Sequence, residues 1–157
     1  MEIRDALPED ALAACEVLRR SISELCAADH HNDPVLLARW LANKTPETVA
    51  SWIAKPDNSV LVAVEADKVL AVGAVTDAGE ITLNYVSPDA RFRGVSRALL
   101  RRLEARALER GNTRCTLVST DTALRFYLAA GYSLTGTPLA KFGMQSSHPM
   151  VRHLSVP

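Results

Sequence analysis

The stretch that decides the fold is RFRGVSRALLRRLEARA, residues 91–107. Two arginines flank a phenylalanine, and a single glycine, Gly94, precedes a run in which apolar residues recur about every fourth position. This spacing predicts an amphipathic helix. A helix interior disfavours glycine by about 1 kcal/mol relative to alanine. We therefore expect Gly94 at the start of a helix that spans 94–110 and stops at Gly111.

The position of Gly94 suggests a site for an anion. The first N–H groups of a helix lack partners within the helix and carry a partial positive charge, so a phosphate can bind there. Because glycine has no Cβ, an anion can approach its backbone closely. Arg91 and Arg93 add positive charge beside Gly94, and Arg97 follows one turn later. These residues predict either a pyrophosphate site or a tight turn whose arginines face water.

The remaining patterns predict an α/β (α+β mixed) domain. Hydrophobic periods and turn signals give these elements in order: strand 2–7, helices 8–27, 34–44 and 45–56, three strands within 59–88, helix 94–110, strand 114–120, helix 121–130, and strands 132–136 and 148–156. This order favours a central mixed, mostly antiparallel sheet of roughly six to seven strands with helices on both faces. We expect one domain over residues 1–157.

Composition narrows the class of protein. Lys+Arg and Asp+Glu number 18 each, so the formal net charge is zero, and a general nucleic-acid binder would carry a basic excess. No apolar run approaches the roughly 20 residues that cross a bilayer, and the acidic N-terminus has no signal core. We expect a cytoplasmic protein that binds neither nucleic acid nor membrane.

Cysteine and histidine patterns do not indicate a metal site. Cys15, Cys26 and Cys115 show no metal-ligand spacing, and free cysteines are commonly small buried residues. The adjacent His30 and His31 lie in a polar segment with no third histidine nearby. We expect no bound metal.

Two motifs resemble those of the GNAT acetyltransferase superfamily, whose members bind acetyl-CoA. RFRGVS at 91–96 is similar to its Q/R-x-x-G-x-G/A signature, and ALRFYLAAGY at 123–132 is similar to its late-helix pattern A-x-x-F-Y-x-x-x-G-F/Y. The expected order of elements also matches over essentially the whole chain. Two departures are Ser96, where glycine or alanine is usual, and Thr120, where many members have asparagine.

The resemblance implies how acetyl-CoA would bind. Backbone N–H groups from Arg91 to Arg97 would hold the pyrophosphate. The pantetheine arm would lie between the strands that end near Val86 and Ser119, and the N–H of Val86 would bind the oxyanion. The residues assigned to donor binding are Tyr85, Val86, Arg91, Phe92, Arg93, Gly94, Val95, Ser96, Arg97, Ala98, Thr120 and Phe126.

The resemblance also suggests two catalytic side chains. Tyr127 matches the family's late-helix tyrosine, and a phenol with a pKa near ~10 can protonate the leaving thiolate. Glu80 stands where some protein-lysine acetyltransferases carry their general base. Glu80, Thr82 and Asn84 alternate toward one face of the expected strand. If Glu80 is only a solvated turn residue, a water held by Asn84 or Thr82 would take the proton.

The function that follows is transfer of an acetyl group from acetyl-CoA directly to a primary amine. One alternative is an acyl-CoA-binding regulatory module without catalysis. Another is an acetyltransferase for protein N-termini or lysines. The sequence does not identify the acceptor, and a homodimer is compatible with the resemblance.

Overall fold

The computed structural model describes residues 1–141 and 144–155. The elements are, in chain order, β1 (Glu2–Asp5), η1 (Pro8–Asp10), α1 (Ala11–Leu25), α2 (Ala27–His30), α3 (Pro34–Leu41), α4 (Pro46–Ala54), β2 (Asn58–Glu65), β3 (Lys68–Thr76), β4 (Glu80–Val86), η2 (Pro88–Ala90), α5 (Val95–Glu109), β5 (Arg114–Ser119), α6 (Leu124–Ala129), β6 (Ser133–Leu134), β7 (Leu139–Lys141) and β8 (Met144–His153).

The described strands form the predicted mixed sheet. Its order is β1-β2-β3-β4-β5-β8-β6, and β7 also pairs with β8. The β4–β5 pair is parallel, and the other described pairs are antiparallel. This confirms the expected fold class. The parallel pair is joined through α5, as a parallel connection requires a crossover.

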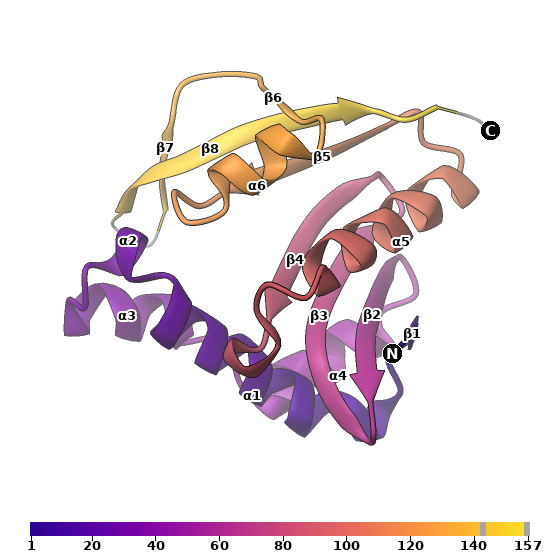
Figure 1. Ribbon diagram of the computed structural model, residues 1–157, viewed down its shortest axis with the longest axis horizontal. Coiled ribbons are helices and arrows are strands. Elements are labelled where there is room, and N and C mark those ends of the chain that lie inside the picture. Colours follow the sequence, from indigo (N-terminus) through magenta and orange to yellow (C-terminus); the bar gives the residue numbers. More distant parts are fainter. Residues whose placement is uncertain (142–143, 156–157) are drawn as a thin grey trace.

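Helices cover both faces of the sheet (Figure 1). One apolar core gathers buried residues of α5 and α6 with one face of the sheet. A second core gathers α1 and α4 on the other face. The predicted period of α5 is confirmed, because Val95, Leu99, Leu103 and Ala107 are all buried. α5 packs so closely on β3 that a Cβ at Gly73 would lie 2.7 Å from Leu103 Cδ1.

Several boundaries differ from the prediction. The polar segment after α1 contains a short helix, α2, whose His30 is fully buried. A short strand, β7, was not expected, and β8 begins at Met144 because it pairs with β7 as well as with β5. α6 begins at Leu124 rather than at residue 121. Residue 156 of the last predicted strand lies outside the described residues.

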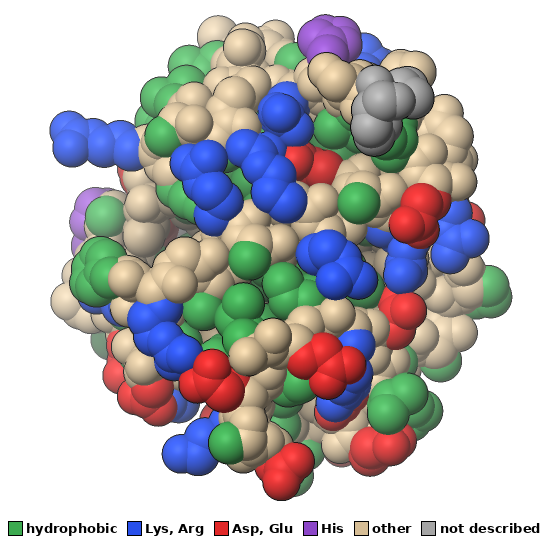
Figure 2. Space-filling view, turned by 45° about the vertical axis from the view of Figure 1, so that its right-hand side comes forward, with side chains coloured by type: hydrophobic (Ala, Val, Ile, Leu, Met, Phe, Trp, Pro, Cys, Tyr) green, Lys and Arg blue, Asp and Glu red, His purple; other side chains and the backbone are tan. Residues whose placement is uncertain are grey.

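Charged residues of both signs share the surface. On the face shown in Figure 2, Lys and Arg side chains are interspersed with Asp and Glu side chains. Within residues 1–141 and 144–155, none of the helices combines the length and the apolar run that a bilayer crossing needs.

Candidate active site

β4 and β5 separate soon after they begin to pair. Their parallel register covers only Glu80↔Thr116 and Ile81↔Leu117, whereas β4 continues to Val86 and β5 to Ser119. A cavity of about 460 Å³ opens between the two strands and extends to the start of α5. Such a splay leaves backbone groups of both strands without a neighbouring strand, so an extended chain can pair there.

The loop at one end of this cavity enters α5 through left-handed backbone. Gly94 is the N-cap of α5 with φ of 74°, and Phe92 has φ of 62°. A bulky residue such as Phe92 rarely adopts this conformation, and its side chain is 93% exposed. A Cβ at Gly94 would meet no atom within 4 Å. The backbone of the first turn of α5 is therefore open to a ligand.

Two ion pairs anchor this loop to the rest of the fold. Arg20 of α1 donates to Asp89 at 2.9 Å, and Arg93 donates to Glu65 at 2.9 Å. These hydrogen bonds hold the pKa of Asp89 and of Glu65 below the ordinary carboxyl value. The side chain of Arg93 thus faces β2 and does not line the cavity. The cationic side chains that do line it in the described part of the chain are Arg91 and Arg97.

The backbone N–H of Val86 faces the opening. Ser87 N–H donates to Leu70 at 2.7 Å. Since ladder bonds of an antiparallel pair fall on alternate residues, Val86 directs its N–H away from β3 and toward β5. β5 no longer pairs with β4 at this level. This N–H is therefore open to a ligand in the splay, and its role as oxyanion donor stays a prediction.

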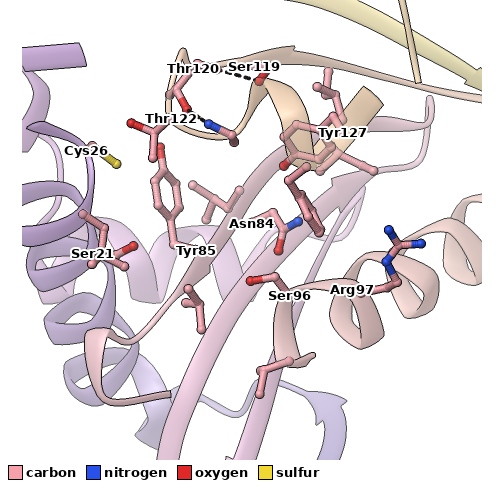
Figure 3. A pocket seen from close by; sticks show the side chains of 18 of the residues that line it. Ser21, Cys26, Asn84, Tyr85, Ser96, Arg97, Ser119, Thr120, Thr122 and Tyr127 are labelled. Atoms are coloured by element: carbon pink, nitrogen blue, oxygen red, sulfur yellow. Dashed lines mark hydrogen bonds between the residues drawn. The ribbon is translucent and has the colours of Figure 1, made fainter. Parts of the chain in front are cut away.

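Tyr127 lies at the same cavity from the opposite side. It projects from α6 and is 6% exposed, with its ring 5.6 Å from the ring of Tyr132. Burial raises the pKa of Tyr127 to about 12, and the influence of the nearby Asn84 amide acts in the opposite direction. The phenol therefore keeps its proton throughout the neutral range. Figure 3 shows Tyr127 and Asn84 facing the same space.

Asn84 has a polar atom without a partner. Its Oδ1 is buried and accepts no hydrogen bond from the described residues. Asn84 is on β4 beyond a bulge, because Ala74 pairs with Leu83 while Val75 pairs with Ile81, which leaves Thr82 unpaired. The bulge interrupts the regular alternation that the sequence predicted for Glu80, Thr82 and Asn84. Thr82 and Asn84 line the cavity, but Glu80 does not.

Glu80 lies at the closed end of the splay. It begins β4, its side chain is exposed, and its residue pairs with Thr116. The structure therefore does not bring Glu80 to Tyr127 and Val86, and its role as a base stays a prediction.

The far wall of the cavity is formed by α1 and the loop after β5. Ser21 lines it from α1 and Cys26 from the residue that follows α1, and Thr122 lines it from the loop. Asp29, which is 2% exposed, accepts hydrogen bonds from the backbone N–H groups of Asp121 at 2.7 Å and Thr122 at 3.2 Å. The Thr122 hydroxyl also donates to Asp29. The sequence analysis missed this contact, because the residues are more than ninety positions apart.

Burial raises the pKa of the Cys26 thiol to about 12, so Cys26 is protonated at neutral pH. Tyr85 packs against the same wall, and burial likewise raises the pKa of its phenol. His30 does not face a ligand site. Its Nδ1 accepts from Asn32 N–H at 3.0 Å, and its Nε2 lies 2.9 Å from the Ile22 carbonyl oxygen. This arrangement fixes the tautomer that donates from Nε2.

Most of the residues assigned to donor binding meet at this cavity. The predicted residues that line it are Tyr85, Val86, Arg91, Phe92, Gly94, Val95, Ser96, Arg97, Thr120, Phe126 and Tyr127. Arg93 and Ala98 do not line it. Thr120 contributes in a second way, because its hydroxyl oxygen accepts the N–H of Ala123 at 3.2 Å and so shapes the turn into α6.

Comparison with solved structures finds the same fold repeatedly. A GCN5-related N-acetyltransferase from Rhodopseudomonas palustris is 24% identical, with a TM-score of 0.86 over 98% of this chain and 95% of that one. The PaiA N-acetyltransferase of Thermoplasma acidophilum, solved with coenzyme A, is 19% identical, with a TM-score of 0.85 over 98% of both chains. The yncA acetyltransferase of Salmonella typhimurium, solved with acetyl-CoA, is 20% identical, with a TM-score of 0.75 over 100% of this chain and 95% of that one.

No curated protein matches the sequence closely enough to count as a relative. The family described as "Acetyltransferase (GNAT) domain" matches residues 26–154, which include the whole splay, the Gly94 loop and α6. The chain therefore belongs to the GNAT acetyltransferase family.

Proposed function

We propose that this protein transfers the acetyl group of acetyl-CoA directly to a primary amine. The observation that carries the proposal is the convergence of three features at one cavity: the open first turn of α5, the inward N–H of Val86 and the protonated phenol of Tyr127. Acetyl-CoA or coenzyme A is bound in solved structures of the same fold. We also propose that residues 1–157 act as one catalytic domain.

The residues present fit the donor. The Gly94 loop supplies unpaired N–H groups and Arg91 and Arg97 supply charge, which suits a pyrophosphate. The splay suits an extended arm with amide groups. When bound there, the thioester supplies the acyl group and a thiolate leaving group.

The chain's own groups then have distinct roles. As the amine nitrogen forms its bond to the acetyl carbonyl carbon, the N–H of Val86 stabilises the negative charge on the carbonyl oxygen. When the C–S bond breaks, the sulfur keeps the electron pair, and Tyr127 gives it a proton. The proton that leaves the amine restores Tyr127 through solvent, so the net reaction transfers one acetyl group and one proton.

Two routes remain for removing the proton of the amine. One uses Glu80 and the other uses water beside Thr82 or Asn84. The second agrees better with the geometry. Thr82 and Glu80 are both exposed, but only Thr82 lines the cavity.

The fold does not identify the amine that accepts the acetyl group. Structural neighbours include a ribosomal-protein-alanine N-acetyltransferase and an aminoglycoside 6'-N-acetyltransferase, at 20% and 15% identity. Cytoplasmic location and a homodimer also stay predictions, to be checked by cell fractionation and by the mass of the protein in solution.

The test is release of free thiol from acetyl-CoA with a panel of aminoglycosides, polyamines, small monoamines and peptides with free α-amines. We expect thiol release that depends on one class of amine, with the acetylated amine found by mass spectrometry. Tight binding of coenzyme A without thiol release from any amine would instead favour a regulatory acyl-CoA-binding module.

A further inference from the structure

The unpaired Oδ1 of Asn84 indicates that a ligand group binds there. It is the one buried side-chain oxygen or nitrogen without a hydrogen-bond partner among the described residues. Leaving such an atom unpaired costs stability, and native proteins rarely retain one without a reason. Since Asn84 lines the cavity, the missing partner is expected to be a group of the bound molecule. An amide oxygen only accepts, so that group must carry an N–H or O–H.

The strand geometry decides which side of the cavity Asn84 serves. Side chains alternate along β4 beyond the bulge. Tyr85 packs toward α1 and α3, and Val86 packs with the α5 and α6 core. Asn84 therefore points toward α5 and α6, away from the wall formed by Ser21 and Cys26. In Figure 3 it lies between Tyr127 and Ser96, on the way from the phenol to the first turn of α5.

This location favours the donor over the acceptor as the source of the N–H. The arm of a bound acyl-CoA must run from its pyrophosphate, at the first turn of α5, to its sulfur, at Tyr127. The N–H groups of such an arm belong to secondary amides.

We propose that Asn84 links donor binding to proton delivery: its Oδ1 accepts a hydrogen bond from an amide N–H of the acyl-CoA arm, and its Nδ2 holds the Tyr127 phenol oxygen in place at the thioester sulfur. This inference rests on the proposed function. The Asn84 and Tyr127 side chains face the same space (Figure 3), and the influence of the Asn84 amide lowers the phenol pKa against the effect of burial, which supports the second contact. With Nδ2 donating to the phenol oxygen, the phenol O–H is free to point at the sulfur.

The two contacts use opposite ends of one rigid amide. A ligand N–H on Oδ1 fixes the orientation that presents Nδ2 to Tyr127. Asn84 is thus a donor-binding residue and a positioning residue for Tyr127.

The first arm of the test measures binding of coenzyme A by calorimetry, so it does not depend on activity. Asn84→Leu removes both contacts and keeps the volume, and we expect it to weaken affinity about tenfold, as loss of a buried hydrogen bond predicts. Asn84→Asp keeps an acceptor oxygen and should lose less affinity than Asn84→Leu. Thr116→Val is the matched control, because Thr116 is half-buried on neighbouring β5 and does not line the cavity. Affinity within twofold of wild type in Asn84→Leu would overturn the ligand contact.

The second arm measures kcat at saturating acetyl-CoA in a double-mutant cycle with Tyr127→Phe. If Asn84 acts through the phenol, Asn84→Leu lowers kcat in the wild-type background and has little effect in the Tyr127→Phe background. Asn84→Asp should lower kcat as well, because it lacks the Nδ2 donor. If the two substitutions lowered kcat independently, so that their fold-effects multiplied in the double variant, the positioning role would be overturned. Melting temperatures near that of wild type show that each variant is folded. Failure of the wild type itself to bind coenzyme A or release thiol would instead refute the proposed function.

Discussion

Asp29 at the end of α2 holds Thr122 at the start of the turn into α6. The Asp29 carboxylate accepts the backbone N–H of Thr122 at 3.2 Å and also its hydroxyl, and the carboxylate is almost completely buried. Through this contact the helical N-terminal part of the chain fixes the loop that closes one side of the cavity. The loop carries Thr120 and leads to Tyr127, so the contact joins the two sides of the site.

Asp29→Asn should destabilise the protein and weaken donor binding. Asparagine offers one acceptor oxygen where the carboxylate has two, and its N–H₂ would face backbone donors. We expect a loss of about 1–3 kcal/mol in the free energy of unfolding, measured by urea denaturation. Asp57→Asn is the control, since Asp57 is exposed and lies 3.9 Å from Lys55; it should change stability by less than about 0.5 kcal/mol. Equal stability of the two variants would contradict a structural role for Asp29.

Gly94→Glu should abolish tight donor binding without unfolding the protein. Gly94 and Gly111 flank α5, both have positive φ, and a Cβ at either would meet no atom within 4 Å. Each substitution therefore costs a similar conformational strain, on the order of 1 kcal/mol. Only the side chain at Gly94 places a negative charge beside the cavity. We expect coenzyme A affinity, measured by calorimetry, to fall well over about tenfold in Gly94→Glu and to stay near wild type in Gly111→Glu.

Tyr127→Phe should lower kcat while leaving donor affinity nearly intact. The ring and its packing survive, and only the proton donor is lost. A thiolate with a pKa near ~8.5 is a tolerable leaving group, so we expect a partial loss, at or below the roughly 10²–10⁴-fold of acid–base catalysis. Tyr132→Phe is the matched control. Tyr132 donates to Glu104 at 2.7 Å away from the cavity, so its variant should lose stability and keep kcat. Full activity of Tyr127→Phe, with chemistry rate-limiting, would make Tyr127 a packing residue.

Glu80→Gln should change kcat/KM less than about threefold, because Glu80 lies outside the cavity and water can take the amine proton there. The measurement is the pH–rate profile of the variant beside that of wild type. An upward shift of the rising limb, with lower turnover at neutral pH, would restore Glu80 as the general base.

Stability should fall at alkaline pH. Burial raises the pKa of Cys26 to about 12 and that of Cys115 to about 11, above the ordinary value of 9.0. The folded chain thus keeps protons that the unfolded chain releases above about pH 9. The free energy of unfolding therefore falls as pH rises, by ~1.4 kcal/mol per pH unit for each such proton. Urea denaturation between about pH 8 and 10.5 should show this decline. The stability of Cys26→Ser should decline less steeply with pH. If the stability of the wild type did not change over this pH range, the burial of the thiols would be contradicted.

The sequence by itself determined the local features of the site. Apolar residues about four apart define α5, and Gly94 supplies the positive φ at its start, because both depend on neighbouring residues. Equally short sequence patterns predict the strand before the Gly94 loop and the tyrosine of α6, Tyr127. These features were enough to predict the mixed sheet and most of the residues that line the cavity.

Only the tertiary structure decided how those residues are used. Arg93 turns to Glu65 instead of the cavity because β2 and β3 bring a carboxylate beside the loop. Glu80 lies at the closed end of the splay because it pairs with Thr116 of β5, and the bulge at Thr82 changes the face to which the residues after it point. The unpaired oxygen of Asn84 and the cap that Asp29 provides depend on elements far apart in the chain. The periodicity of apolar residues indicates which face of a helix or strand is buried. Which side chains from distant elements contact each other depends on how those elements pack in the folded protein.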